Sequence, residues 1–153
     1  MIEQRLKELG LELPRAATPQ FEYVPVVVHG GLAWVSGQLP KIGEDIETRG
    51  KVGGGVSLET AQDCARICIL QGLACLKDAL GGDLGRIERM VKVTGFVASA
   101  PGFNAQPKVI DAASKLLGAL MGEQGRHARS AVGVAELPRD APVEIELVVA
   151  VRG

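Results

Sequence analysis

Arg129 is the residue with the clearest chemical potential in this sequence. It opens the segment RSAVGVA, and on an extended strand its same-face neighbours are Ala131, Gly133 and Ala135. A permanent cation over small side chains can receive a carboxylate, because the planar guanidinium offers a fork of donors matched to two oxygens. A structural arginine paired with a glutamate at an interface is the alternative. The pattern favours a carboxylate receptor.

The segment from residue 129 to residue 152 predicts two strands joined by the turn PRDAP, and these strands must position the arginine. The second strand alternates without a break and turns its bulky side chains one way: Val143, Ile145, Leu147, Val149 and Val151. Because a sheet buries its bulky face against helices, we expect Val132 and Val134 to lie with them. A hairpin of these two strands places Val132 and Val134 on that bulky face only if its register is shifted, so that residue 137 pairs with about residue 144.

This hairpin has a consequence for the site. It places Arg129 on the same face as Glu144 and Glu146 but near the opposite end from Glu144. About seven residues, at roughly 3.3 Å each, separate Arg129 from Glu144 by about 23 Å. One small pocket cannot contain both side chains from a single chain. A site that uses both must therefore be assembled between subunits.

The rest of the chain predicts one α+β domain, residues 1–153, in which residues 1–20 form an N-terminal helix and extension. The expected order is a helix at 2–9, strands at 24–28 and 32–36, a helix from a Ser57 cap to about 80, a strand at 89–98 and a helix at about 104–122. Together with the hairpin, these elements predict a mixed, mainly antiparallel sheet with two helices on one face. The other face, small and partly polar, requires a cover from another chain.

Composition limits the classes of partner. The net charge is −1, the isoelectric point is about 6.1 and aromatic residues make up 3% of the chain, so no basic or stacking surface for nucleic acid is expected. Hydrophobic residues reach 46% and the mean hydropathy is +0.17, yet no apolar run is long enough to span a membrane. Burial in an oligomer explains this excess better than a membrane does.

The cysteines and the N-terminus indicate a reducing, cytoplasmic setting. Cys64, Cys68 and Cys75 share one predicted helix, where they serve as small buried hydrophobes. With only two histidines, His29 and His127, no metal site is expected, and His127 is predicted to be an exposed loop residue. The charged segment 1–10 lacks the pattern of a signal peptide.

The order of these motifs resembles the RidA/YjgF family of imine deaminases. Residues 35–40, VSGQLP, resemble the family's SGQ-hydrophobic-P segment, and Tyr23 lies thirteen residues before Ser36, where the family has a pocket tyrosine. Residues 128–138, ARSAVGVAELP, resemble the signature ARS-x-V-x-V-A-x-LP, and residues 143–146, VEIE, resemble the family's IEIE strand. Pro107, Ala131 and the pair Phe21-Glu22 depart from the family's usual residues, which indicates a divergent subgroup.

The resemblance implies a fold and a chemistry. The fold would be the chorismate-mutase-like RidA fold, a homotrimer with its sheets facing the centre. The reaction would be the hydrolysis of reactive enamines and imines, such as 2-aminoacrylate, to 2-keto acids and ammonia without a cofactor or metal. Arg129 would hold the substrate carboxylate, and Glu144 of a neighbouring subunit would orient or activate water. The substrate-binding residues would be Tyr23, Ser36, Gly37, Phe103 and Ala131.

Two other functions stay open. A non-catalytic trimer could bind a small carboxylate through the same arginine and act as a sensor. Endoribonuclease activity, a label that some relatives carry, is disfavoured by the absence of a basic patch and a histidine pair.

Overall fold

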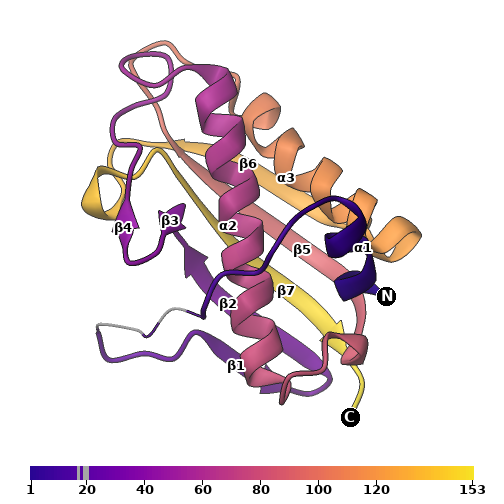
Figure 1. Cartoon of the computed structure of the whole chain (residues 1–153). Helices are drawn as coiled ribbons and strands as arrows, with labels where there is room; N and C mark the ends of the chain where they lie inside the picture. Colours follow the sequence, from indigo (N-terminus) through magenta and orange to yellow (C-terminus); the bar gives the residue numbers. More distant parts are fainter. Residues whose placement is uncertain (17, 19–20) are drawn as a thin grey trace.

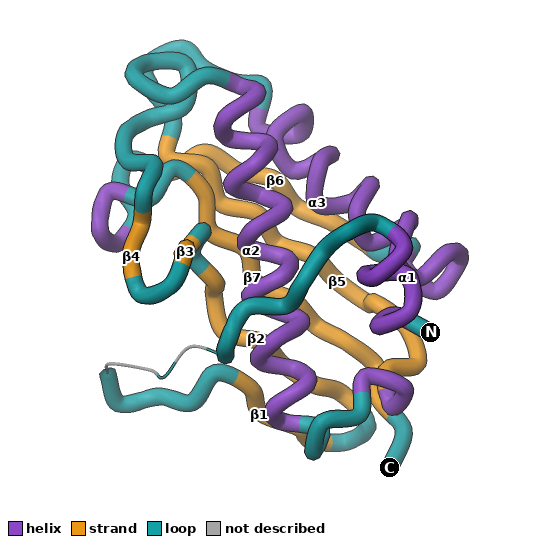
Figure 2. The backbone as a smooth tube through the Cα atoms, in the orientation of Figure 1, coloured by secondary structure: helices purple, strands orange, loops and turns teal. Residues whose placement is uncertain are grey.

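The computed structural model describes residues 1–16, 18 and 21–153. A five-stranded mixed sheet has the order β1-β2-β7-β5-β6, and two long helices, α2 and α3, run side by side across one of its faces (Figures 1 and 2). The strands are β1 (Val26–His29), β2 (Leu32–Gln38), β5 (Ile87–Ala98), β6 (Ala128–Val134) and β7 (Val143–Val151). The helices are α1 (Ile2–Glu8), α2 (Leu58–Ala79) and α3 (Gln106–Met121). The α+β class and the two helices on one face are confirmed.

Smaller elements complete the chain. Strands β3 (Lys41–Ile42) and β4 (Asp45–Ile46) form a separate hairpin within the segment 41–55, which the sequence predicted as a loop. Among the described residues, short 3-10 helices lie at Leu84–Arg86, Gly122–Gly125 and Pro138–Asp140. None of the helices in the described part of the chain has the length and apolar character needed to cross a lipid bilayer.

Helix α2 forms where the sequence predicts it, because its cap and its buried stripe are local features. The Ser57 hydroxyl accepts a hydrogen bond from the Thr60 backbone N–H at 3.2 Å, as an N-cap does. Cys64, Cys68 and Cys75 are all buried, as expected, and burial raises the pKa of the Cys64 and Cys68 thiols. These thiols therefore serve packing, since a buried thiol with a raised pKa is a poor nucleophile.

Strand β7 occupies a central position in the sheet. Its bulky face is buried at every second residue, as the alternation predicted: Val143, Ile145, Leu147, Val149 and Val151. Helix α2 packs on this face closely enough that a Cβ at Gly72 would lie 2.9 Å from Leu147 Cδ1. A strand with an unbroken aliphatic face gains most from burial between two neighbours, and β7 pairs with both β2 and β5.

The predicted hairpin between β6 and β7 is wrong. Strand β6 pairs with β5 in parallel, opposite Lys92 to Ala98, and β5 lies between β6 and β7. The β5-α3-β6 segment is thus a crossover unit of parallel strands joined by a helix. Strand β6 carries Arg129, Ser130 and Gly133, which suit a sheet edge better than a buried centre, and the turn after it carries the chain past β5 to the place of β7.

The face assigned to Arg129 is also wrong. In the observed register Arg129 lies opposite Val93, which in turn lies opposite Leu147, so all three side chains share the helix-covered face. Val132 lies opposite Phe96, whose partner on β7 is Glu144, so Val132 and Glu144 share the other face. The bulk of Val132 did not bring it to the helices, because the register with β5 determines which residues face them.

The sheet face without helices carries exposed apolar side chains. Trp34 is 53% exposed and Val27 is 50% exposed, and Val132 is also exposed. Within the described residues, α2 and α3 pack on the opposite face, so the predicted uncovered face is confirmed for a single chain. Its cover by further copies in a trimer stays a prediction.

Candidate functional site

A cavity of about 500 Å³ brings together three of the predicted site residues, Tyr23, Gly37 and Glu144. It opens between the segment before β1, the end of β2, the β3 strand and the turn after β6. Its full lining comprises Thr18, Phe21, Tyr23, Pro25, Gly37, Gln38, Leu39, Lys41, Pro138, Arg139 and Glu144. The mixture of apolar walls with a few charged groups is typical of a small-molecule site.

Glu144 reaches this cavity because β2 is irregular beside it. The register of β2 against β7 shifts between Val35 and Gln38, and Gly37 lies in this shift. A Cβ at Gly37 would lie only 2.7 Å from Glu144 Oε2, so the carboxyl group rests against a position where a side chain would exclude it. Burial, and secondly the charge of Glu146, raise the pKa of Glu144. A carboxyl group whose pKa is raised above its ordinary value holds a proton more readily than a free carboxyl group does, which suits it to general acid and base chemistry.

Arg129 is anchored to helix α3. Its Nη1 donates to Asp111 Oδ1 at 2.8 Å and to Ser114 Oγ at 3.1 Å, while Nη2 lies 3.5 Å from the Pro107 carbonyl oxygen. Within one chain the ionic partner of Arg129 is thus an aspartate, Asp111, and the pairing with a glutamate at an interface stays an alternative prediction. Within the part of the chain that the structure describes, Nε makes no hydrogen bond, so the Nε and Nη2 edge of the fork has donors for a carboxylate.

His127 does not match the prediction of an exposed loop residue. It is half-buried, its Nδ1 lies 2.6 Å from the Gly125 carbonyl oxygen, and its Nε2 lies 2.9 Å from Ser114 Oγ. Because a carbonyl only accepts, Nδ1 carries the proton, and in the neutral ring Nε2 accepts from the Ser114 hydroxyl. Asp111, Arg129, Ser114 and His127 therefore form one continuous network beside a cavity of about 290 Å³.

The other predicted binding residues lie outside the Glu144 cavity. The Ser36 hydroxyl donates to the Val24 carbonyl at 2.9 Å and borders a hollow on the uncovered sheet face. Phe103 packs against Gly53, where a Cβ would lie 2.8 Å from Phe103 Cδ1. Ala131 shares the helix-covered face with Arg129 and packs against the core.

Within one chain, five of the predicted residues fall into two groups. Tyr23, Gly37 and Glu144 belong to the cavity, whereas Arg129 and Ala131 lie on the opposite face of the sheet and on its far edge. Strand β5 separates the strands that carry Glu144 and Arg129. The sequence also predicted that one chain cannot bring Arg129 and Glu144 into one pocket, but it did so from a hairpin that does not form. In the structure, the two side chains are apart because they face opposite sides of the sheet.

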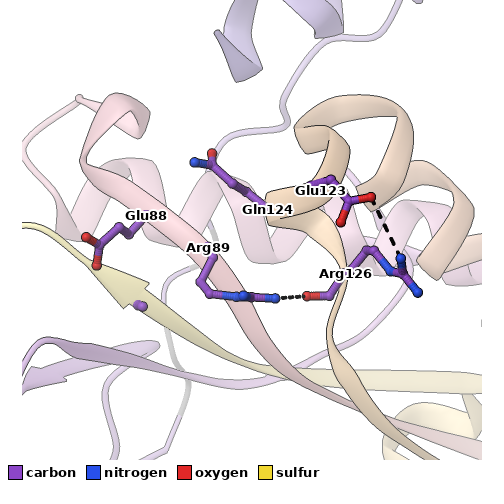
Figure 3. Close-up of a pocket in the computed structure, with 6 residues that line it drawn as sticks. Glu88, Arg89, Glu123, Gln124 and Arg126 are labelled. Carbon is purple, nitrogen blue, oxygen red and sulfur yellow. Dashed lines mark hydrogen bonds and ion pairs between the residues drawn. The ribbon is translucent and has the colours of Figure 1, made fainter.

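Another cavity, of about 510 Å³, lies at the other end of the sheet and contains none of the predicted site residues (Figure 3). Arg89 Nη2 donates to the Arg126 carbonyl at 2.7 Å, and the Arg126 guanidinium lies 3.7 Å from Glu123. Figure 3 shows the Glu88 side chain pointing away from the others, while Arg89 extends to the Arg126 backbone and the Arg126 side chain points to Glu123. The labelled side chains around this hollow therefore do not converge on one point.

Sequence reasoning missed Lys41 and Arg139 in the lining of the Glu144 cavity and Asp111 beside Arg129. Lys41 belonged to a charged segment without a recognisable pattern, and Asp111 lay in a predicted helix whose partner strand was misplaced. Among the residues that the structure describes, no three histidine, cysteine, aspartate or glutamate side chains are placed to hold one metal ion.

Residues 3–148 match a protein family described as "YjgF/chorismate_mutase-like, putative endoribonuclease". The chain is 43% identical to protein TCP17 of Trypanosoma cruzi over 97% of this chain and 92% of that protein. It is 30% identical to the 2-iminobutanoate/2-iminopropanoate deaminase of Dermatophagoides farinae, over 92% of this chain and 94% of that one. The crystal structure of Atu1372 from Agrobacterium tumefaciens, a protein of unknown function, superposes with a TM-score of 0.92 at 49% identity and covers 99% of this chain and 92% of its own.

Proposed function

The chain belongs to the YjgF/RidA family, and from that premise we propose that it hydrolyses reactive 2-imino acids, or their enamine tautomers, to 2-keto acids and ammonia. Support comes from the cavity in which Tyr23 and Gly37 surround the buried carboxyl of Glu144. It also comes from the name of the Dermatophagoides farinae relative, which acts on 2-iminobutanoate and 2-iminopropanoate. The substrate class of this chain is thus proposed from a relative and from the chemistry of the cavity.

The proposed site forms between two copies of the chain in a homotrimer. One copy supplies Tyr23, Gly37 and Glu144, and its neighbour supplies Arg129 and Ala131 from the edge strand β6. This arrangement is supported by the opposite facing of Arg129 and Glu144, which prevents one chain from presenting both to a small molecule. It is also supported by the exposed apolar surface on the helix-free face, which includes Trp34 and Val27.

The chemistry needs positioning and one proton carrier. The Nε and Nη2 edge of Arg129 binds the substrate carboxylate and directs the imine carbon towards Glu144. The substrate reacts as its protonated iminium. The ionised Glu144 carboxyl takes a proton from water as the oxygen bonds to the iminium carbon, and the C=N π electrons move to nitrogen, which gives a neutral carbinolamine. The protonated carboxyl then returns its proton to the amino nitrogen. The C–N bond breaks as the C=O bond forms, and the departing ammonia takes the hydroxyl proton, so a keto acid and ammonium leave and Glu144 is ionised again. An imine is already electrophilic, so these steps require no cofactor.

The first test measures keto-acid formation from 2-iminopropanoate generated in situ by an amino acid oxidase. We expect Arg129→Ala to lower kcat/KM about 100-fold or more, since charged hydrogen bonds contribute about 1.5–3 kcal/mol each. Arg66→Ala, which removes an exposed arginine on α2 that pairs with Asp63, is the matched control and should match the unaltered protein. If the unaltered protein does not accelerate the reaction but binds keto acids saturably, the sensor function replaces the deaminase.

A second test addresses the shared site. Arg129→Ala and Glu144→Gln variants are each expected to be inactive, and refolding them together should restore activity in about one quarter of the sites of randomly mixed trimers. Restoration occurs because some interfaces then combine an intact Arg129 with an intact Glu144. A mixture as inactive as its components would contradict a site shared between copies.

A further inference from the structure

The cavity that contains Glu144 also contains two cationic side chains, Lys41 and Arg139. Among the described residues, the Lys41 ammonium makes no ion pair or hydrogen bond, so its charge is available to a ligand. Arg139 Nη2 donates to Asp45 Oδ1 and to the Glu44 carbonyl, each at 3.1 Å, which leaves donors on its other nitrogens. The lining thus holds two cations and one carboxyl group, an excess of positive charge that neither the reacting imine nor the water requires.

The backbone holds Arg139 at this cavity at a conformational cost. Arg139 and Asp140 both have left-handed backbone angles, with φ of 59° and 58°, which side-chain-bearing residues rarely adopt. Hydrogen bonds maintain the turn: the Gly50 N–H donates to the Asp140 carbonyl at 2.9 Å, and Arg49 Nε donates to the Arg139 carbonyl at 3.3 Å. Strained residues of this kind persist where surrounding structure holds them and are common at ligand sites. The strained turn therefore presents Arg139 in a defined place.

The cavity is also larger than a three-carbon imino acid requires. Its volume of about 500 Å³ falls in the range of roughly 300–1,000 Å³ that ligand pockets occupy. The exposed rings of Phe21 and Tyr23 border it, and such rings can pack against a methylene chain. A substrate that fills this space carries a side chain, and the two cations, Lys41 and Arg139, indicate that this side chain ends in a negative charge.

We infer that this chain prefers 2-imino dicarboxylates, whose side-chain carboxylate binds between Lys41 and Arg139. The inference rests on the proposed function, because it assigns the second end of the same substrate. The 2-carboxylate is bound by Arg129 of the neighbouring copy, the imine carbon lies at Glu144, and the side chain extends along the aromatic rings towards the two cations. The products are a keto dicarboxylate and ammonia, formed by the same addition of water.

The test compares imines generated in situ from glutamate and aspartate with the imine generated from 2-aminobutyrate. The measured quantity is the selectivity, defined as kcat/KM for an acidic imine divided by kcat/KM for the neutral one. We expect Lys41→Met and Arg139→Gln each to lower this selectivity about 10- to 150-fold, the equivalent of one charged hydrogen bond. Lys41→Glu should reverse the preference towards the imine generated from lysine.

Matched controls and a binding measurement separate the possible failures. Lys115→Met and Arg66→Gln remove exposed cations on the helices and should leave the selectivity unchanged. Calorimetric titration with 2-oxoglutarate and 2-oxobutanoate tests the anion site without any reaction, and we expect Lys41→Met to weaken only the former. If neutral imines are preferred and Lys41→Met changes neither selectivity nor 2-oxoglutarate binding, the inference is wrong while the deaminase function stands. If no imine is hydrolysed, the function fails, and the titration alone decides whether Lys41 and Arg139 bind an anion.

Discussion

Gly37→Ala is a minimal change with a calculable effect on the candidate site. The added Cβ would lie 2.7 Å from Glu144 Oε2 and 2.8 Å from its Cδ, whereas ordinary contacts begin at 3.4 Å. The carboxyl group must therefore retreat by about 0.7 Å, and displacements near 1 Å can lower catalytic rates about 100-fold. We expect kcat/KM for 2-iminobutanoate to fall about 10- to 100-fold, equivalent to about 1.4–2.7 kcal/mol. The assay is keto-acid release at saturating oxidase, together with a thermal melt.

A double-mutant cycle shows whether this loss acts through Glu144. Glu144→Ala removes the atoms that the new Cβ would meet, so Gly37→Ala should add no further loss in that background. Gly55→Ala, at a glycine where a Cβ would meet nothing within 4 Å, is the matched control. Equal losses from Gly37→Ala with and without the Glu144 side chain would refute the reasoning, as would a fully active Gly37→Ala variant.

Three further changes test the electrostatics, the core and the uncovered face. The pKa of Glu144 is raised by burial and by Glu146, so its charged form is less stable in the folded protein than in the unfolded chain. The protonated Glu144 carboxyl therefore contributes stability that is complete below its pKa in the unfolded chain and is lost as pH rises through its pKa in the folded protein. Because a glutamine does not ionise, Glu144→Gln should stabilise the protein at neutral pH and lose this advantage in acid. Urea denaturation across pH measures this, and a gain that grows in acid would contradict it. A Cβ at Gly95 would overlap the end of Ile110, so Gly95→Ala should lower the free energy of unfolding by about 1–3 kcal/mol. Ile110→Ala is itself destabilising because Ile110 is buried, but Gly95→Ala should cost less in the Ile110→Ala background than in the unaltered protein. Denaturant curves that show no loss would mean that α3 moves freely away from the sheet. Trp34→Glu places a charge on the helix-free face and should reduce self-association in light scattering, and an unchanged mass would show that assembly does not use that face.

Much of the fold could be predicted because its signals are local. Ser57 caps α2 through its own hydroxyl, and the alternation of β7 identifies its buried face, from Val143 to Val151, without knowledge of its neighbours. The glycine pair Gly81-Gly82, with left-handed φ angles of 70° and 91°, follows the end of α2 where a helix stop is expected. Each of these features depends on residues a few positions apart.

Only part of the candidate site could be predicted from such local signals. Tyr23, Gly37 and Glu144 were predicted from motifs and meet in one cavity. Arg129 was identified, but its anchor on Asp111 was not, because the helix that covers β6 could not be assigned to it from the sequence.

The sequence by itself determined the strands of the main sheet and the α-helices to within a few residues, and which residues alternate together within each strand, but not the β3–β4 hairpin or the 3-10 helices. Only the tertiary structure decided that β5 separates β6 from β7, and therefore that Arg129 faces the helices while Glu144 faces away. Alternation relates side chains within one strand, whereas the relation between strands depends on order and register, which the packing of the whole core selects. For the same reason the left-handed turn at Arg139 and its position beside Lys41 were not visible in the order of residues.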